Sequence, residues 1–240
     1  ESQDGVGINQ ITTSEGLRAS ASTAYLRPAL RRANLRVETA AHATAIVFEG
    51  LRAAGVRYRR GGRPLEAHAR CEVILAAGAI GSPQLLQLSG VGPGAALQAL
   101  GIAAVADSPA VGRNLQDHLC IDHLYRARVP TLNAELGTWL GQLRAGLNYV
   151  ARRRGPLALS VNQGGGFVRS RSGLSKPNLQ LYFSPLSYTR AAPNQRALMR
   201  PDPFPGFLLS AQPCRPSSRG HLTLASPDPF AAPSIFPNSL

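Results

Sequence analysis

The sequence contains almost no lysine. Of its 26 basic residues only Lys176 is a lysine, and with 13 acidic residues the formal net charge is +13. Such a charge is typical of proteins that bind nucleic acid or an anionic surface. The arginines, however, are spread along the chain in short clusters, and no nucleic-acid-binding motif accompanies them. We therefore expect a solvated basic surface and no nucleic-acid partner, and keep a basic nucleic-acid-binding module as an alternative.

Cysteine is scarce as well. Cys71, Cys120 and Cys214 lie far apart, and no CxxC pair or metal-ligand spacing occurs. This pattern argues against a disulfide framework and against a catalytic thiol. We expect three buried free thiols in a reducing compartment, and no metal site.

Long apolar runs and targeting signals are also absent. No apolar run approaches the roughly 18 residues that a membrane span needs, and no basic-then-apolar leader follows Glu1. We expect a location in the cytoplasm or at the periphery of a membrane. The sequence has no GxGxxG turn after a strand, and neither end coincides with a finished element. We therefore expect the chain to be the middle of a longer protein.

Strand and helix patterns alternate in the first half of the chain. Small polar residues favour a helix over 16–33, capped by Ser20 or Ser22. Alternating residues predict strands in 34–50, and a hairpin turning at Gly61 and Gly62 is expected within 51–70. EVILAA (72–77) predicts a buried strand, followed by a small-residue turn and a helix. Glycine and alanine in that turn leave room for a backbone that lies close to a ligand.

The second half has a different character. A further helix is expected at 95–101 and a strand at 102–106, and residues 136–155 predict an amphipathic helix that ends in basic residues and a glycine. Short strand patterns separated by proline and glycine follow, beginning near residues 164, 179, 206 and 220. The sequence predicts an α/β fold, α+β overall, with two domains. Residues 1–117 form part of a nucleotide-binding domain, and 118–240 form a domain with an antiparallel sheet and flanking helices.

A polar loop joins these two predicted domains. Asn114, Asp117 and His118 stand close together in VGRNLQDHL (111–119). An Asp–His pair is one arrangement for general acid–base catalysis. The alternative is that Asn and Asp organise a turn while His118 hydrogen-bonds to backbone. Both interpretations stay open.

Five segments, in order, resemble the glucose-methanol-choline (GMC) oxidoreductase family. GAIGSPQLLQLSGVGPG (78–94) resembles the second signature of that family, in a choline dehydrogenase-like form. Four further stretches match its pattern in sequence order: GLRASASTAYLRPALRRANLRV, VGRNLQDHL, GGGFVRS and HLTLASPDPFAAPSIFPNSL. Together they cover nearly all 240 residues. The resemblance implies part of an FAD-binding, Rossmann-like domain, followed by a substrate domain.

The resemblance further implies an FAD enzyme that oxidises the CH–OH group of a small alcohol by hydride transfer to flavin N5. By similarity, Ala43 lies at the adenine-contacting position, and Ala77 and Gly78 match the small residues beside adenosine. The family's pyrophosphate-binding turn belongs before this stretch. Its catalytic histidine and that residue's partner belong beyond residue 240, so no catalytic residue is assigned, and His118 and His221 do not replace them.

Gln163 is the one residue that bears on substrate. The family stretch resembling SVNQGGGFVR often has glutamate at this position, where a carboxylate suits a cation such as choline. Glutamine offers hydrogen bonds instead, or serves the neighbouring backbone; Tyr182, Phe183 and Tyr188 are further candidates to line a substrate pocket. As an isolated chain we expect weak or no FAD binding and no turnover. The alternatives are a hydroxynitrile lyase on the same scaffold, or a truncated gene product without function. The electron acceptor and oligomeric state are not predicted.

Overall fold

The structure is a computed structural model that describes residues 4–189 and 200–239. It divides into two compact units, each described separately below. Unit 1 contains residues 1–35 and 118–215, and unit 2 contains residues 36–117 and 216–240. This division shares the 117/118 boundary with the domains expected from the sequence, and those domains remain a prediction.

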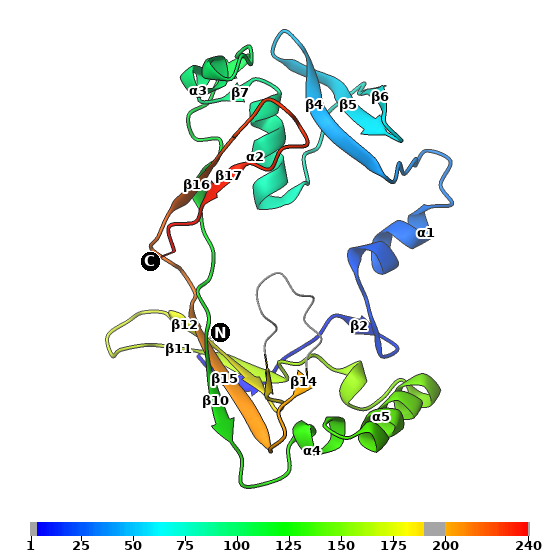
Figure 1. Cartoon of the computed structure of the whole chain (residues 1–240), viewed down its shortest axis with the longest axis vertical. Coiled ribbons are helices and arrows are strands. Elements are labelled where there is room, and N and C mark those ends of the chain that lie inside the picture. Colours follow the sequence, from blue (N-terminus) through cyan, green and yellow to red (C-terminus); the bar gives the residue numbers. More distant parts are fainter. Residues whose placement is uncertain (1–3, 190–199, 240) are drawn as a thin grey trace. The chain divides into compact units, whose positions relative to one another are not determined.

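The described elements are short (Figure 1). The helices are η1 (Ser22–Leu26), α1 (Arg27–Ala29), α2 (Gly78–Leu88), α3 (Gly94–Ala99), α4 (Leu132–Leu136), α5 (Trp139–Arg152) and η2 (Pro156–Ala158). The strands are β1 (Gly5–Ile8), β2 (Thr13–Ser14), β3 (Leu17–Arg18), β4 (Ala41–Glu49), β5 (Arg52–Arg60), β6 (Arg63–His68), β7 (Val91–Gly92), β8 (Ala106–Asp107), β9 (Arg113–Leu115), β10 (Ile121–Arg126), β11 (Gly164–Val168), β12 (Leu179–Ser184), β13 (Tyr188–Thr189), β14 (Arg200–Pro201), β15 (Gly206–Pro213), β16 (Gly220–Thr223) and β17 (Ser234–Phe236).

Unit 1 is built on a five-stranded sheet. Its strand order is β1-β11-β12-β15-β10, and every neighbouring pair is antiparallel. In β15 each buried residue is followed by a less buried one, as expected for a strand whose two faces differ. The antiparallel sheet and flanking helices predicted for the second half are therefore confirmed. The sequence did not predict that β1, near the start of the chain, forms an edge of this sheet.

Two capped helices precede β11 in unit 1. The Thr131 hydroxyl accepts from the backbone N–H of Asn133, and the Thr138 hydroxyl accepts from that of Gly141. The long helix predicted within 136–155 is thus confirmed as α5. It ends at Arg153, whose φ of 54° is left-handed, rather than at the predicted glycine. Gly155, two residues later, also has a positive φ, so the glycine continues a reversal that begins at the arginine.

Unit 2 combines a β-meander with α2. Strands β4, β5 and β6 form an antiparallel sheet, and the tight turn at Gly61 and Gly62 lies where the sequence predicts it. The hydroxyl of Ser89, just after α2, accepts from the buried N–H of Ile46 in β4 at 2.8 Å. That bond ties the C-terminal end of the helix to the middle of the strand. Among the named strands of the described residues, the only parallel pairing is between β7 and β8.

Three expectations are wrong. Residues 72–77 form no strand, and Ile74 is 76% exposed, because no described strand pairs with this segment. Most of the strand expected at 102–106 is irregular, and only Ala106 enters β8. The three cysteines are free thiols, but Cys71 and Cys120 are exposed and Cys214 is only partly buried, since all three lie outside the strands.

The helix expected near the start of the chain is present in a shorter form. The π-helical turn η1 and the one-turn α1 cover residues 22–29, including Tyr25 and Leu26. The hydroxyl oxygen of Ser20 lies 3.3 Å from the backbone nitrogen of Thr23, as expected of a capping serine. Pro28 lies in α1, where its missing N–H is tolerated in the first turn.

Candidate functional site

One face of the sheet in unit 1 carries a row of glycines and polar residues across its middle, with Phe167, Leu124 and Leu208 on the same face to either side of the row. The strand registers place Gly7, Gly165, Tyr182, Ser210 and Asp122 opposite one another in a row that crosses all five strands. Directly opposed residues share a face, so these side chains point to the same side of the sheet. We call this side, with Gln180, Gln212 and Cys120 next to the row, the polar face. The other face carries Val6, Ile8, Leu181, Phe183, Phe207 and Leu209.

A hydrogen-bond network connects the centre of the polar face. The side-chain nitrogen of Gln212 donates to the Tyr182 hydroxyl at 2.8 Å and to the Gln180 side-chain oxygen at 3.1 Å. Nδ1 of His118 lies 3.5 Å from the same nitrogen. Gln212 is only 9% exposed, so these partners satisfy a polar group that has little access to water.

A second pair of side chains extends the polar face toward β10. The Ser210 hydroxyl donates to the Asp122 carboxylate at 2.6 Å. Ser210 is 8% exposed, whereas Asp122 is half-buried. The Asp122 carboxylate thus lies two strands away from Tyr182, and the Ser210 hydroxyl that donates to it lies on the strand between them.

The hydroxyl of Tyr182 has a raised pKa. Desolvation raises the pKa of its hydroxyl above the usual value of 10.0, and the nearby Cys120 and Cys214 raise it further. Negative charge on either thiol disfavours a phenolate beside it. The hydroxyl therefore keeps its proton throughout the physiological pH range.

Gln163 lies next to the polar face. Its backbone N–H donates to the Phe183 carbonyl at 3.0 Å, and its carbonyl accepts from the N–H of Asn9 at 2.9 Å. Gly165, two residues on, is opposite Tyr182, so Gln163 lies diagonally from Tyr182, a relation with Cα separations of about 7–8 Å in antiparallel sheets. The sequence-predicted substrate residue and Tyr182 are therefore neighbours.

The three residues expected to contact a cofactor all lie in unit 2. Ala43 is exposed on β4, and Ala77 and Gly78 are exposed at the start of α2. Gly78 has a φ of 81°, and a Cβ on it would meet no atom within 4 Å. Its backbone is therefore open to the close approach of a ligand, which fits the adenosine side of a dinucleotide. None of these residues supplies a partner for the pyrophosphate.

A short segment near the end of the chain links β4 and α2. The carbonyl oxygen of Pro229 lies 3.0 Å from Nε2 of His42, and that of Ala231 accepts from the Gln84 side chain at 3.0 Å. His42 precedes Ala43 directly, and Gln84 is in the middle of α2. The start of β4 and the middle of α2 therefore both contact this segment of unit 2.

The polar loop between the two halves favours the structural alternative for His118. Nε2 of His118 lies 3.3 Å from the Cys214 carbonyl oxygen, and Nδ1 faces Gln212. A proton on Nε2 satisfies both contacts, because Nδ1 then accepts. Asn114 lies in β9 with a φ of 60°, as expected of an asparagine that shapes a turn. His221 stacks on Phe236 with ring centroids 4.7 Å apart.

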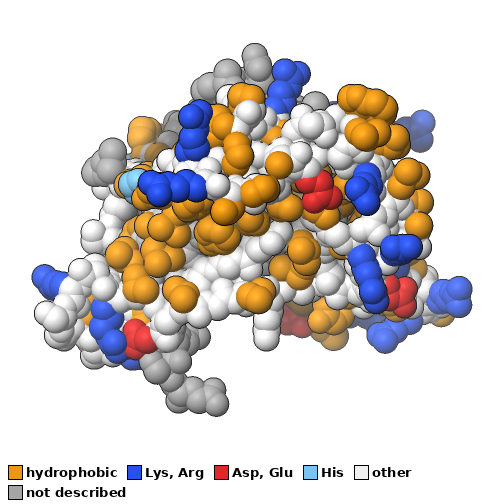
Figure 2. Space-filling view, turned by 90° about the horizontal axis from the view of Figure 1, so that it is seen from below, with side chains coloured by type: hydrophobic (Ala, Val, Ile, Leu, Met, Phe, Trp, Pro, Cys, Tyr) orange, Lys and Arg blue, Asp and Glu red, His pale blue; other side chains and the backbone are white. Residues whose placement is uncertain are grey.

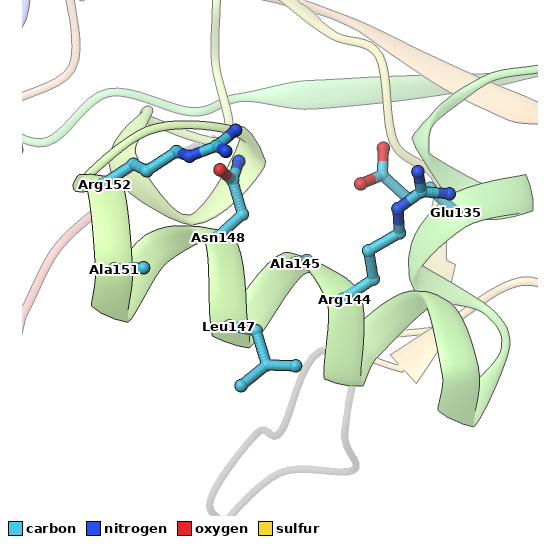
Figure 3. Close-up of a pocket in the computed structure, with 7 residues that line it drawn as sticks. All are labelled: Glu135, Arg144, Ala145, Leu147, Asn148, Ala151 and Arg152. Atoms are coloured by element: carbon cyan, nitrogen blue, oxygen red, sulfur yellow. The ribbon is translucent and has the colours of Figure 1, made fainter.

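Unit 1 also has two cavities. One, of about 310 Å³, is lined by apolar residues of the opposite sheet face, including Ile8, Leu181 and Phe183, and also by Gly7, Gly165 and Tyr182 of the row. The other, of about 490 Å³, lies along α4 and α5. In Figure 3, Glu135 and Arg144 point toward one another, and Asn148 and Arg152 meet at the other end. Its mixed lining suits a polar group, but no sequence-predicted site residue contributes to it.

The surface charge is dispersed. Figure 2 shows arginine and lysine side chains separated by hydrophobic and acidic ones, with no continuous basic patch on the visible face. In the described ranges, no helix is long and apolar enough to cross a membrane. Within the same residues, no three His, Cys, Asp or Glu side chains gather in a way that would hold a metal ion.

The sequence does not predict that Tyr182 and Gln212 together form a site. From the sequence, Tyr182 is only one of three aromatic candidates to line a substrate pocket, and Gln212 is not a candidate. The available signal was the alternation of polar residues in LQLYFS and LLSAQP, which marks one face of each strand. Strand register, which decides that these particular residues meet, is not contained in either segment alone.

Comparison with known proteins identifies the relatives of this chain. The family model described as GMC oxidoreductase matches residues 1–120, which is half of the chain. The oxygen-dependent choline dehydrogenase of Photobacterium profundum is 39% identical over 239 residues, covering 97% of this chain and 40% of the relative. The protein of the same name from Burkholderia multivorans is 41% identical over 237 residues, covering 98% of this chain and 41% of that relative.

Solved structures of known proteins share the fold of this chain. The formate oxidase of Aspergillus oryzae, studied for its FAD modification, matches with a TM-score of 0.84 and 24% identity. The match covers 98% of this chain and 44% of that protein, so the fold is shared while the chain spans only about two-fifths of its relatives. From the family model and from relatives that align with almost every residue, the chain belongs to the GMC oxidoreductase family.

Proposed function

We propose that this chain is the central part of an FAD-dependent oxidoreductase that acts on the CH–OH group of an alcohol. Membership of the family carries the proposal, and the named relatives are choline dehydrogenases. The polar sheet face supports it, because neutral donors and acceptors beside a glycine-rich strand suit a small hydroxylated ligand.

FAD is the cofactor of this proposal. Ala43, Ala77 and Gly78 are the residues of this chain that we propose to lie against its adenosine portion, and the open backbone at Gly78 supports that role. When bound, FAD would supply the two-electron acceptor for the alcohol. The residues described here bind and orient ligands, and we assign no proton acceptor among them.

For the substrate we propose a neutral small alcohol rather than choline. Choline is named in the relatives, and a quaternary ammonium is bound best by aromatic rings or a carboxylate. Gln163 is neutral. The carboxylate of Asp122 lies two strands away from Tyr182 and accepts a hydrogen bond from Ser210. Hydrogen bonding is therefore the main means of recognition that this face offers.

A cytoplasmic location, free or at the periphery of a membrane, is part of the proposal. Trp139, Leu143 and Leu147 are 75%, 51% and 62% exposed on α5, which ends in a run of arginines. Exposed apolar residues beside basic ones are typical of helices that lie on anionic lipid. Flotation with phosphatidylglycerol vesicles at low and high salt distinguishes the two forms.

The decisive experiment uses the full-length protein of which this chain is the proposed central part: alcohols are added anaerobically to its flavin-loaded form and the flavin absorbance is recorded. We expect bleaching by a small alcohol, and the ratio of bleaching rates for 2-methoxyethanol and choline tests the substrate proposal. A flavin that stays oxidised while a cyanohydrin is cleaved would support a hydroxynitrile lyase instead. Failure to bind any flavin would contradict the proposed function.

A further inference from the structure

The direction of the hydrogen bonds at Tyr182 is fixed by their neighbours. The oxygen of the Gln180 side chain lies 3.1 Å from the side-chain nitrogen of Gln212, so that nitrogen must be the donor. The Tyr182 hydroxyl, at 2.8 Å from the same nitrogen, is then an acceptor. The third neighbour, Nδ1 of His118, accepts in the tautomer that also satisfies the Cys214 carbonyl. The two N–H groups of the Gln212 amide are used by its two shorter contacts, to Tyr182 and Gln180, and an acceptor at Nδ1 of His118 agrees with the same orientation of the amide.

This arrangement leaves the phenolic proton of Tyr182 available. In the part of the chain that the structure describes, no residue accepts this proton. The raised pKa keeps the proton in place at neutral pH, so the group is a donor and not an anion. The hydroxyl oxygen of Tyr182 thus accepts a hydrogen bond from Gln212, and its O–H group can donate to a ligand.

The surroundings of Tyr182 leave space on one side. Its neighbours in the row toward the sheet edge are Gly165 and Gly7, which contribute no side chains. A Cβ on Gly7 would meet nothing within 4 Å, whereas one on Gly165 would lie 2.5 Å from the Leu181 carbonyl oxygen and 3.2 Å from the side-chain oxygen of Asn9. Toward the sheet edge the row therefore carries no side chain, is open at Gly7, and is bordered at Gly165 by the neutral amide of Asn9.

We propose that the Tyr182 hydroxyl donates a hydrogen bond to a second, neutral oxygen of the alcohol, and that Gln212 is the positioning residue that aims it. The proposal rests on the proposed function and names its substrate class: alcohols with an ether, hydroxyl or carbonyl oxygen near the carbinol carbon. A site built around such a donor discriminates against an analogue that lacks the acceptor, because the donor then stays unpaired.

The test compares two alcohols of equal size. 2-Methoxyethanol and 1-butanol differ only in an ether oxygen that replaces a methylene. With the full-length, flavin-loaded protein we expect kcat/KM to favour 2-methoxyethanol by about tenfold, the value of one neutral hydrogen bond. Tyr182→Phe should abolish the preference. Gln212→Glu should do the same while retaining the hydroxyl, because a carboxylate accepts the phenolic proton and withdraws it from the substrate.

Tyr125→Phe is the matched control. Tyr125 belongs to β10 of the same sheet but stacks on Phe207, which lies on the opposite face, with ring centroids 5.2 Å apart. Its substitution should leave the ratio between the two alcohols unchanged. Retention of the preference in Tyr182→Phe, or its equal loss in Tyr125→Phe, would overturn the proposal.

A second readout separates this proposal from the proposed function. In protein labelled with ¹³C in its tyrosine rings, the Tyr182 signals are identified by their absence from Tyr182→Phe. We expect 2-methoxyethanol to shift them and 1-butanol to leave them in place, whether or not flavin is reduced. A shift without flavin reduction contradicts only the proposed function. Flavin reduction without a shift contradicts only the role of Tyr182.

Discussion

The side chain of Asn133 pairs with the backbone of Ser187 in both directions. Its nitrogen donates to the Ser187 carbonyl at 2.8 Å, and its oxygen accepts from the Ser187 N–H at 3.0 Å. The same nitrogen reaches the carbonyl of Asp202 at 3.1 Å. Asn133 is 4% exposed and Ser187 is fully buried. The side-chain amide of Asn133, on α4, therefore pairs with the backbone after β12 as a neighbouring strand would, by one donated and one accepted hydrogen bond.

Asn133→Ala should destabilise the protein strongly. The substitution removes the described partners of the Ser187 N–H and the Asp202 carbonyl in a buried site, while the Ser187 carbonyl keeps the N–H of Asp202, so we expect a loss of about 2–4 kcal/mol. Urea unfolding followed by circular dichroism measures this value. Asn162→Ala, at an exposed position, is the control and should change stability by less than about 0.5 kcal/mol. Equal losses in the two variants would contradict the assigned role of Asn133.

Gly90→Ala should cost more than a positive φ alone explains. Gly90 follows α2 with a φ of 85°, and a Cβ there would lie 2.4 Å from the carbonyl oxygen of Ala103. Gly62 has a φ of 78° and open space at the same position. Gly62→Ala should therefore lose only about 1 kcal/mol of backbone strain, and Gly90→Ala at least about 2 kcal/mol more. Thermal unfolding of both variants measures the difference.

Local patterns predicted the elements whose determinants lie within one segment. The Gly61–Gly62 turn, α5 and the strands from Gly164 onward follow from turn chemistry and from alternation along the chain. Residues 72–77 show the limit of this approach. Their composition is that of a buried strand, but a strand exists only where another strand pairs with it, and no described strand does.

The candidate site depended on information that no single segment carries. Gln163 was predicted by resemblance, and its backbone pairing with Asn9 and Phe183 required the position of β1, which the sequence did not assign to this sheet. The meeting of Tyr182 and Gln212 required the register between β12 and β15. A shift of one residue would turn either side chain to the opposite face.

Alkaline pH should weaken the protein through Tyr182. The pKa of its hydroxyl is raised in the folded state above the ordinary value of 10.0, so the folded state holds the proton more tightly than the unfolded state. The resulting stabilisation is complete below about pH 10 and is lost as the pH rises through the raised folded-state pKa. Urea midpoints between about pH 9 and 11.5 should therefore fall more steeply in the parent than in Tyr182→Phe. Parallel curves would contradict the shift.

Cofactor binding provides a test of unit 2. Gly78 and Gly61 both have positive φ, 81° and 55°, and a Cβ on either would meet open space, so alanine should cause similar backbone strain at both positions. Only Gly78 lies at the proposed adenosine contact. Gly78→Ala should therefore weaken FAD binding by about tenfold, a loss of about 1.4 kcal/mol, measured by quenching of flavin fluorescence.

Gly61→Ala, in the turn between β5 and β6, should bind FAD as the parent does. The comparison isolates ligand approach from stability, because both variants carry the same strain and neither added methyl group contacts protein. Equal affinities in the two variants would remove Gly78 from the cofactor site, while FAD binding by the parent would still support the family assignment. Weaker binding in Gly78→Ala alone would locate the adenosine portion at the start of α2.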